Sequence, residues 1–305
     1  MHVAVTGGAG FIGAHTCRAL LEAGHRVTAI DDLSHGRREA LADGIELLVL
    51  DVRAPELGEE LVQRRPEAVL HLAAQMDVRR SVADPLYDAS VNVIGTVNAL
   101  AAARRAGARR FVFASSGGAV YGEQEQFPAR EDHPRRPASP YGASKLCGEE
   151  YVELARRGGL STLSLRYANV YGPGQDPLGE AGVVAIFLHR MLSGGEPVVN
   201  GDGRQTRDFV FVEDVARANL LALTSAAAGA LNVGTGLETS VNELAGMLAR
   251  EAGYGRPLRH GPAAPGEQRR SSIDPGAARA QLGWEPHVGL EEGLRSTARW
   301  FRAKS

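Results

Sequence analysis

The chain has 305 residues, of which 44% are hydrophobic and 23% are charged, and its formal net charge is -2. This composition is ordinary for a globular protein and excludes a general electrostatic attraction to nucleic acid. No apolar run approaches the ~18 residues of a membrane span, and the first residues show no signal-peptide pattern, so we expect a cytoplasmic protein without nucleic-acid or membrane partners.

Short β-branched runs alternate with alanine- and leucine-rich amphipathic runs through the first half of the chain. Strands are predicted at residues 2–7, 25–31, 45–52, 68–74, 109–116 and 161–172, and helices at 13–24, 85–107 and 139–159. Cys17 and Cys147 fall in two of these helices, where we interpret them as small buried side chains rather than as a disulfide or a metal site. The alternation predicts an α/β fold with a Rossmann-type, doubly wound parallel sheet.

The second half of the chain is less regular. Residues 172–182 and 260–276 are rich in glycine and proline and are predicted to be loops, and helices are predicted at 183–192, 212–227 and 240–253. The pattern at 207–218 indicates a further strand and helix of the large sheet. We therefore predict a cofactor-binding Rossmann domain at 1–175, to which 208–236 return, and a smaller mixed α/β substrate domain at 176–207 and 237–305.

A glycine-rich turn follows the first predicted strand. Gly7, Gly10 and Gly13 stand between that strand and a helix, where glycine permits a tight turn and brings backbone N–H groups close to a pyrophosphate. Asp31 ends the second strand, 18 residues after Gly13, and a carboxylate there binds an adenosine ribose and repels a 2′-phosphate. The pattern predicts NAD as the cofactor, with NADP as the alternative because of the nearby Arg37–Arg38 pair.

Tyr141 and Lys145 form the candidate catalytic pair. They are four residues apart in a predicted helix and therefore share one face of it. A tyrosine phenol has a reference pKa of about 10, and lowering that pKa by about three units corresponds to roughly 4 kcal/mol. A lysine ammonium and a cationic nicotinamide ring in a dry cleft supply interactions of that size. The spacing therefore predicts a tyrosine base.

Recognisable motifs run along nearly the whole chain: GGAGFIG, DDLSHG, LDVR, HLAAQ, VNVIGT, SSGGAVYG, YGASK, RYANVYGPGQDP, GDGRQTRDFVFVEDVA, NVGTG and PGEQRRSSID. With this set, the chain resembles the extended short-chain dehydrogenase/reductases, and most closely those of the UDP-galactose (UDP-glucose) 4-epimerase type. Such a family member binds NAD and a nucleotide sugar, and relatives pair two of the predicted helices in a homodimer.

The resemblance also implies roles for individual residues. For NAD it implies contacts from Gly7, Gly10, Phe11, Ile12, Gly13, Asp31, Asp51, Val52, Leu72, Ala73, Ala74, Gln75, Tyr141, Lys145 and Tyr167. For the substrate it implies Asn169, Arg207, Arg269 and Ser271. The two arginines are expected to clamp the diphosphate, with Arg270 as the alternative to Arg269, and residues 197–203 are expected to pass the uracil base.

The reaction that the resemblance implies is epimerisation at C4 of UDP-glucose or UDP-galactose through a transient 4-keto sugar. Tyr141 takes the proton of the 4-hydroxyl, NAD takes the hydride, and the keto sugar turns over before it is reduced from the other face. Ser271 stands where epimerases restricted to plain hexoses carry a bulky tyrosine, so N-acetylated sugars are included. A UDP-glucuronate 4-epimerase, another nucleotide-sugar oxidoreductase or a non-catalytic NAD-binding protein are the alternatives.

Two positions depart from the family pattern. Relatives carry a serine or threonine four residues before the tyrosine of the YG motif, and this chain has Gly117 there. We expect Ser116 to supply the missing hydroxyl and to be the third catalytic residue, and the double glycine to make room for a bulkier substrate. Met76 replaces a lysine and is expected to loosen NAD retention. A 4,6-dehydratase, which shares this scaffold, requires an Asp–Glu pair where this chain has Gly118 and Ala119, so we do not expect dehydratase activity.

Overall fold

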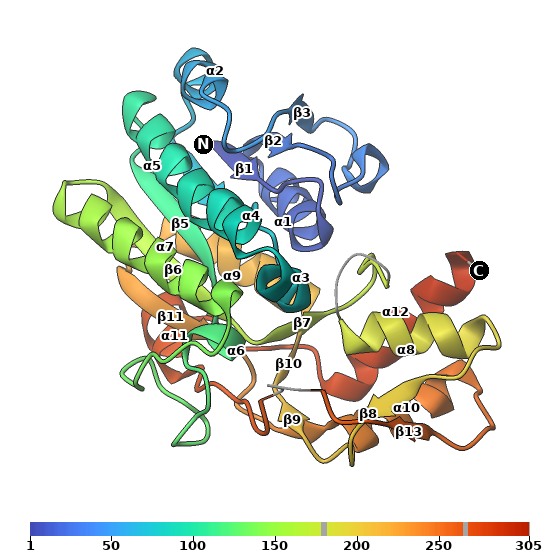
Figure 1. The fold of residues 1–305 in the computed structure, drawn as a ribbon. Helices are drawn as coiled ribbons and strands as arrows, with labels where there is room; N and C mark the ends of the chain where they lie inside the picture. Colours follow the sequence, from blue (N-terminus) through green and yellow to red (C-terminus); the bar gives the residue numbers. More distant parts are fainter. Residues whose placement is uncertain (178–181, 265–267, 305) are drawn as a thin grey trace.

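The computed structural model describes residues 1–177, 182–264 and 268–304. At its centre lies a seven-stranded parallel sheet with the order β11-β6-β5-β4-β1-β2-β3 (Figure 1). The strands are β1 (His2–Thr6), β2 (Arg26–Asp31), β3 (Glu46–Val49), β4 (Ala68–His71), β5 (Arg110–Ser116), β6 (Ser161–Tyr167) and β11 (Gly229–Val233). The predicted Rossmann-type sheet is confirmed.

Helices cover both faces of this sheet, and alternate residues of β1 show which helices cover which face. Val3 and Val5 pack in the apolar cluster formed with α1 (Phe11–Glu22), α9 (Val212–Thr224) and α11 (Gly276–Leu282). Ala4 packs on the other side, with α2 (Glu56–Arg64), α5 (Gly95–Arg105) and α7 (Pro140–Arg157). Burial on both faces explains why β1 is apolar or buried at every position instead of alternating.

The second half of the chain forms a separate apolar cluster. Its helices are α8 (Val183–Leu192), α10 (Val241–Ala252) and α12 (Leu290–Lys304). Beside them lie three strand pairs: β7 (Asn169–Tyr171) with β10 (Phe209–Phe211), β9 (Thr206–Arg207) with β12 (Thr239–Ser240), and β8 (Val198–Asn200) with β13 (Arg259–Gly261). The predicted domain boundaries stay a prediction, although α9 and β11 do join the large sheet.

Several elements differ from the sequence-based expectation. The predicted helix at 85–107 is divided into α4 (Pro85–Ala89), a π-helical turn at Ser90–Ile94, and α5. The predicted strand at 161–172 is also divided, because β7 leaves the central sheet after Ala168 to pair with β10. Helices α2, α3 (Val78–Ala83), α6 (Gly117–Val120), α11 and α12 were not predicted. The double glycine therefore belongs to a short helix rather than to a loop.

Among residues 1–177, 182–264 and 268–304, no helix is long and apolar enough to span a bilayer. Nor do these residues contain a group of three or more histidine, cysteine, aspartate or glutamate side chains arranged to hold a metal ion. Both cysteines are free thiols, and Cys17 is completely buried.

Candidate active site

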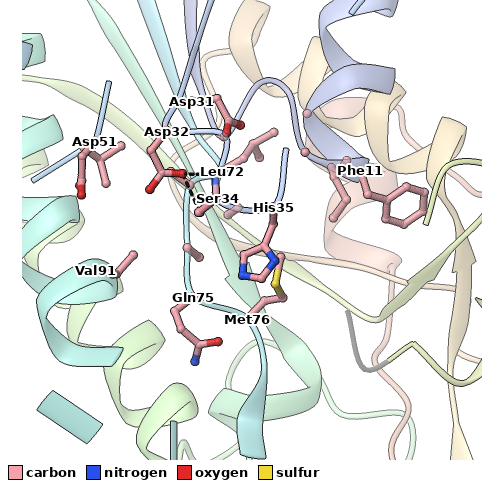
Figure 2. Close-up of a pocket in the computed structure, with 18 of the residues that line it drawn as sticks. Phe11, Asp31, Asp32, Ser34, His35, Asp51, Leu72, Gln75, Met76 and Val91 are labelled. Atoms are coloured by element: carbon pink, nitrogen blue, oxygen red, sulfur yellow. Dashed lines mark hydrogen bonds between the residues drawn. The ribbon is translucent and has the colours of Figure 1, made fainter. Parts of the chain in front are cut away.

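A cavity lies at the carboxyl ends of the central strands, where ligands bind in doubly wound sheets. All fifteen residues predicted to contact the cofactor line it: Gly7, Gly10, Phe11, Ile12, Gly13, Asp31, Asp51, Val52, Leu72, Ala73, Ala74, Gln75, Tyr141, Lys145 and Tyr167. Figure 2 shows how Phe11, Asp31, Asp51 and Gln75 approach it from different elements. The structure therefore brings the predicted set together, while the role of each residue stays a prediction.

The glycine turn at one end of the cavity is too tight for side chains. A Cβ atom at Gly13 would lie 2.0 Å from the carbonyl oxygen of Gly7, and one at Gly7, whose φ is +68°, would lie 2.6 Å from the backbone nitrogen of Ala73. Helix α1 begins at Phe11, and its N-cap residue makes no side-chain capping bond. Its first N–H groups therefore face the cavity without a capping side chain, which fits a pyrophosphate.

Two carboxylates stand where β2 ends. Asp31 is only 7% exposed and accepts hydrogen bonds from the backbone N–H groups of Ala9 (3.0 Å) and Leu33 (2.9 Å). Burial raises its pKa, although these hydrogen bonds oppose the rise. Asp32 also lines the cavity and accepts a hydrogen bond from the hydroxyl of Ser34 (2.6 Å; Figure 2). Carboxylates at this point favour ribose hydroxyls over a phosphate, and the lining includes neither arginine of the 37–38 pair.

The candidate catalytic pair, Tyr141 and Lys145, lines another part of the cavity, on the first turns of α7. The helix starts where Ser139 accepts a hydrogen bond from the N–H of Gly142 (3.1 Å). The Lys145 ammonium donates to the carbonyl oxygen of Ala114 (2.9 Å), and its nitrogen lies 5.8 Å from the centre of the Tyr141 ring. Helix α7 and the end of β5 thus hold both side chains in place.

The protonation of this pair is dominated by burial. Burial raises the pKa of Tyr141 to about 12 and lowers that of Lys145 to about 8. The expected lowering of the tyrosine pKa is therefore not produced by the lysine, because both groups lose hydration that favours their charged forms. A further positive charge beside the phenol, such as an oxidised nicotinamide, acts in the lowering direction.

The side chain of Ser116 acts on the Tyr141 phenol and lowers its pKa, against the larger rise caused by burial. Ser115 lines the cavity, but its hydroxyl is turned away and donates to Glu149 (2.5 Å). A Cβ atom at Gly117 would lie 2.8 Å from Cδ1 of Ile273, so that side chain already occupies the space beside this glycine. Of the two glycines, only Gly118 has open space beside it, because a Cβ atom there would meet nothing within 4 Å, and neither glycine is part of the cavity lining.

The four predicted substrate residues are not part of the lining of this cavity, but backbone hydrogen bonds join the segments that carry them, from Asn169 N–H to Asp208 O (2.9 Å) and from Thr206 N–H to Arg269 O (3.0 Å). Asn169 opens β7, and Arg207, in β9, donates to the carbonyl oxygen of Thr206 (2.7 Å). Ser271 is 3% exposed. Arg269 lines a second hollow and forms an exposed ion pair with Asp202 (2.8 Å). This hollow includes residues 200–202, part of the segment expected to pass uracil.

The alternative clamp, Arg270, has other partners. Its guanidinium pairs with Glu238 (3.1 Å) and stacks 3.8 Å from the centre of the Phe127 ring. It is absent from both cavity linings.

Sequence reasoning missed part of the lining of the first cavity. The additional residues are Asp32, Ser34, His35, Leu50, Arg80, Tyr87, Val91, Ala114 and Ser115, whereas Met76, which the sequence had already linked to NAD retention, lies in the lining as well. Most of them adjoin predicted residues at strand ends, so a wider window around each strand end would have found them. Arg80 and Tyr87 come from α3 and α4, and the arginine lies 4.1 Å from the centre of the tyrosine ring. Only the fold reveals that contact.

Comparison with known proteins places this site in context. Residues 3–234 match the sequence profile of the NAD dependent epimerase/dehydratase family. The chain belongs to this family. It is 47% identical to the UDP-glucose 4-epimerase of Mycolicibacterium smegmatis, over 100% of both chains. The family and the fold that the motifs indicated are thereby confirmed.

Solved structures of the NAD dependent epimerase/dehydratase family agree with the whole architecture. The UDP-glucose 4-epimerase of Thermotoga maritima, determined with UDP-glucose, has a TM-score of 0.97 and 45% identity, covering 100% of this chain and 99% of its own. The UDP-glucose 4-epimerase of Thermus thermophilus, in complex with NAD, has a TM-score of 0.95 and 44% identity, covering 100% of both chains.

Proposed function

We propose that this protein is a UDP-glucose 4-epimerase-type isomerase that interconverts UDP-glucose and UDP-galactose with NAD as its resident cofactor. The observation that carries this proposal is one cavity lined at one end by the glycine turn and at the other by Tyr141 and Lys145. The high identity to epimerases over the full chain supports it.

The residues that hold the cofactor follow from the cavity. The glycine turn and the N-terminus of α1 bind the pyrophosphate, Asp31 binds the adenosine ribose, and Lys145 binds the nicotinamide ribose. NAD, when bound, accepts the hydride from C4 and returns it. These contacts are distributed along the cavity, so the dinucleotide stays in place through both half-reactions.

Tyr141 acts on the substrate as the proton carrier. It removes the proton of the 4-hydroxyl in the first half-reaction and gives it back in the second. The Ser116 hydroxyl, which acts to lower the pKa of Tyr141, orients that proton transfer. Arg207 and Arg269 hold the diphosphate, so the sugar can turn while the nucleotide stays fixed. Asn169 and Ser271 complete the proposed substrate contacts, and the serine accommodates N-acetylated sugars.

We propose a homodimer formed through α3, α4 and α7, which pack against one another on one side of the sheet. Their exposed large apolar residues, with one from the intervening π-helical turn, are Val78, Val82, Leu86, Ile94, Tyr151 and Leu154. Leu86 is 83% exposed and Leu154 is 57% exposed, which is costly for side chains left in water. A cytoplasmic location is proposed as well, in keeping with two free thiols.

Turnover without added cofactor tests the function. The purified protein is incubated separately with UDP-glucose, UDP-N-acetylglucosamine and UDP-glucuronate, and the 4-epimers are measured. We expect turnover of the first two, and Tyr141→Phe is expected to reduce it about 1000-fold. Epimerisation of UDP-glucuronate alone would favour the alternative substrate, and undiminished turnover by Tyr141→Phe would refute the mechanism.

A further inference from the structure

Asp88 is a completely buried carboxylate next to the catalytic helix. It belongs to α4 and is 0% exposed. One oxygen accepts hydrogen bonds from the side-chain amides of Gln75 (3.0 Å) and Asn92 (3.0 Å), and the other accepts from the hydroxyl of Ser144 (2.7 Å). The carboxylate thereby links three segments of the chain. These are the cavity-lining residues after β4, through Gln75, the π-helical turn, through Asn92, and α7, through Ser144, which immediately precedes Lys145.

All three hydrogen-bond donors to Asp88 are neutral. Among residues 1–177, 182–264 and 268–304, no lysine, arginine or histidine forms an ion pair with it. Glu149, the other buried carboxylate close to Lys145, differs in this respect. Arg166 holds it through two hydrogen bonds of 2.9 and 2.7 Å. Asp88 thus differs from Glu149 in that neutral side chains supply all of the hydrogen bonds described for its carboxylate.

The charge of Asp88 acts on both members of the catalytic pair. It raises the pKa of Lys145, against the larger lowering caused by burial, and it raises the pKa of Tyr141. The other titratable groups facing the pair are Glu149 on α7, which also raises the lysine pKa, and His71 on β4. Burial lowers the pKa of His71 to about 3, so this histidine carries no charge at neutral pH.

We propose that Asp88 is the fixed counter-ion of Lys145, a positioning residue that holds the start of α7 through Ser144 and places a buried negative charge near the lysine ammonium. The ammonium must stay charged to bind a ribose and to stabilise a developing phenolate, and burial alone works against both. The inference rests on the proposed function only in its assignment of Tyr141 as the proton carrier.

Two variants separate the charge of Asp88 from its hydrogen bonds. Asp88→Asn keeps the shape, because the amide oxygen still accepts from Gln75 and Asn92 and the amide nitrogen donates to Ser144. Ser144→Ala keeps the charge but removes the bond to α7. Asp88→Ser is a second neutral variant in case the asparagine does not fold. Thermal unfolding identifies the variants that are folded.

The expected result is a shift of the whole pH–rate profile. Asp88→Asn moves both limbs to lower pH by about one unit, because it lowers the pKa of both Tyr141 and Lys145. Ser144→Ala reduces kcat without moving either limb. The proposal would be overturned if Asp88→Asn and Ser144→Ala shifted the profile equally. It would also be overturned if neither Asp88→Asn nor Asp88→Ser shifted it.

A spectroscopic titration gives a readout that does not require turnover. The ultraviolet absorbance of the Tyr141 phenolate is obtained by subtracting the titration of the matching Tyr141→Phe protein. We expect this phenol to ionise about one pH unit lower in Asp88→Asn than in the parent. If the titration of the phenol is unchanged, the proposed role of Asp88 is refuted even when the enzyme is active. If the titration is shifted in a protein that epimerises no sugar, the role of Asp88 is upheld although the proposed function fails.

Discussion

The two halves of the proposed site are built differently. On the cofactor side, backbone atoms, strand ends and glycine contacts form the cavity, and all predicted residues meet there. On the nucleotide side, the predicted residues are single side chains on separate elements, and Arg269 is exposed and paired with Asp202. A backbone-built site depends on main-chain geometry that a short motif specifies, whereas a side-chain site depends on how distant segments come together.

A methyl group in the glycine turn provides the harshest test of the backbone-built half. Gly13→Ala places its Cβ against the backbone of Gly7 and Gly8, which has no freedom to move, and we expect a loss of about 3 kcal/mol in unfolding free energy. The purified Gly13→Ala protein should also contain no bound NAD. Gly118→Ala, with open space around its Cβ, is the control. Denaturant unfolding and the NAD content of the purified proteins measure both, and full NAD loading of Gly13→Ala would contradict the comparison.

Removing the Ser116 hydroxyl tests the catalytic end of the same cavity. We expect Ser116→Ala to lower kcat about 100-fold, because the variant loses the hydroxyl that lowers the Tyr141 pKa and is proposed to orient its proton transfer. NAD content and thermal stability should stay unchanged, since the glycine turn is untouched. Steady-state kinetics with UDP-galactose measure the effect. A kcat within experimental error of the parent would show that another group orients the proton.

Substitutions in the side-chain-built half are expected to change the affinity for UDP rather than the stability of the fold. Arg269→Gln should weaken UDP binding about tenfold, the size of one charge-assisted hydrogen bond. The melting temperature should not change, because the ion pair with Asp202 is exposed. Calorimetric titration with UDP measures the affinity. Arg270→Gln is the matched control, and a larger loss in that variant would make Arg270 the clamp.

The smallest effect is expected at the glycine that departs from the family pattern. Gly117→Ser meets the flexible end of Ile273, which can move by a few tenths of an ångström. We therefore expect kcat to change by no more than about threefold, or roughly 0.6 kcal/mol. The same substitution in the Ser116→Ala background shows whether position 117 is able to supply the hydroxyl. A large recovery of kcat there would assign the orienting role to position 117.

Local patterns predicted the elements of the cofactor half because each strand and its following turn are continuous in sequence. They did not predict α12, in which Leu294, Ala298 and Phe301 pack into the second cluster although charged residues separate them. Local patterns also could not predict contacts between residues far apart in the sequence, such as that between Gly117 and Ile273. The cluster around Asp88 likewise exists only because three elements meet.

The position of β11 has a consequence for how the protein is made. This strand completes the central sheet beside β6, and α9 joins α1 through the bond from Asn219 to Thr16 (3.0 Å), which spans 203 residues of chain. Such long-range contacts slow folding, because a large loop must close first. While the ribosome is still adding residues before Gly229, β6 has an unpaired edge and α1 lacks its cover. The nascent chain therefore exposes apolar surface until about three-quarters of the chain has been synthesised. Chaperones can bind this surface during that period.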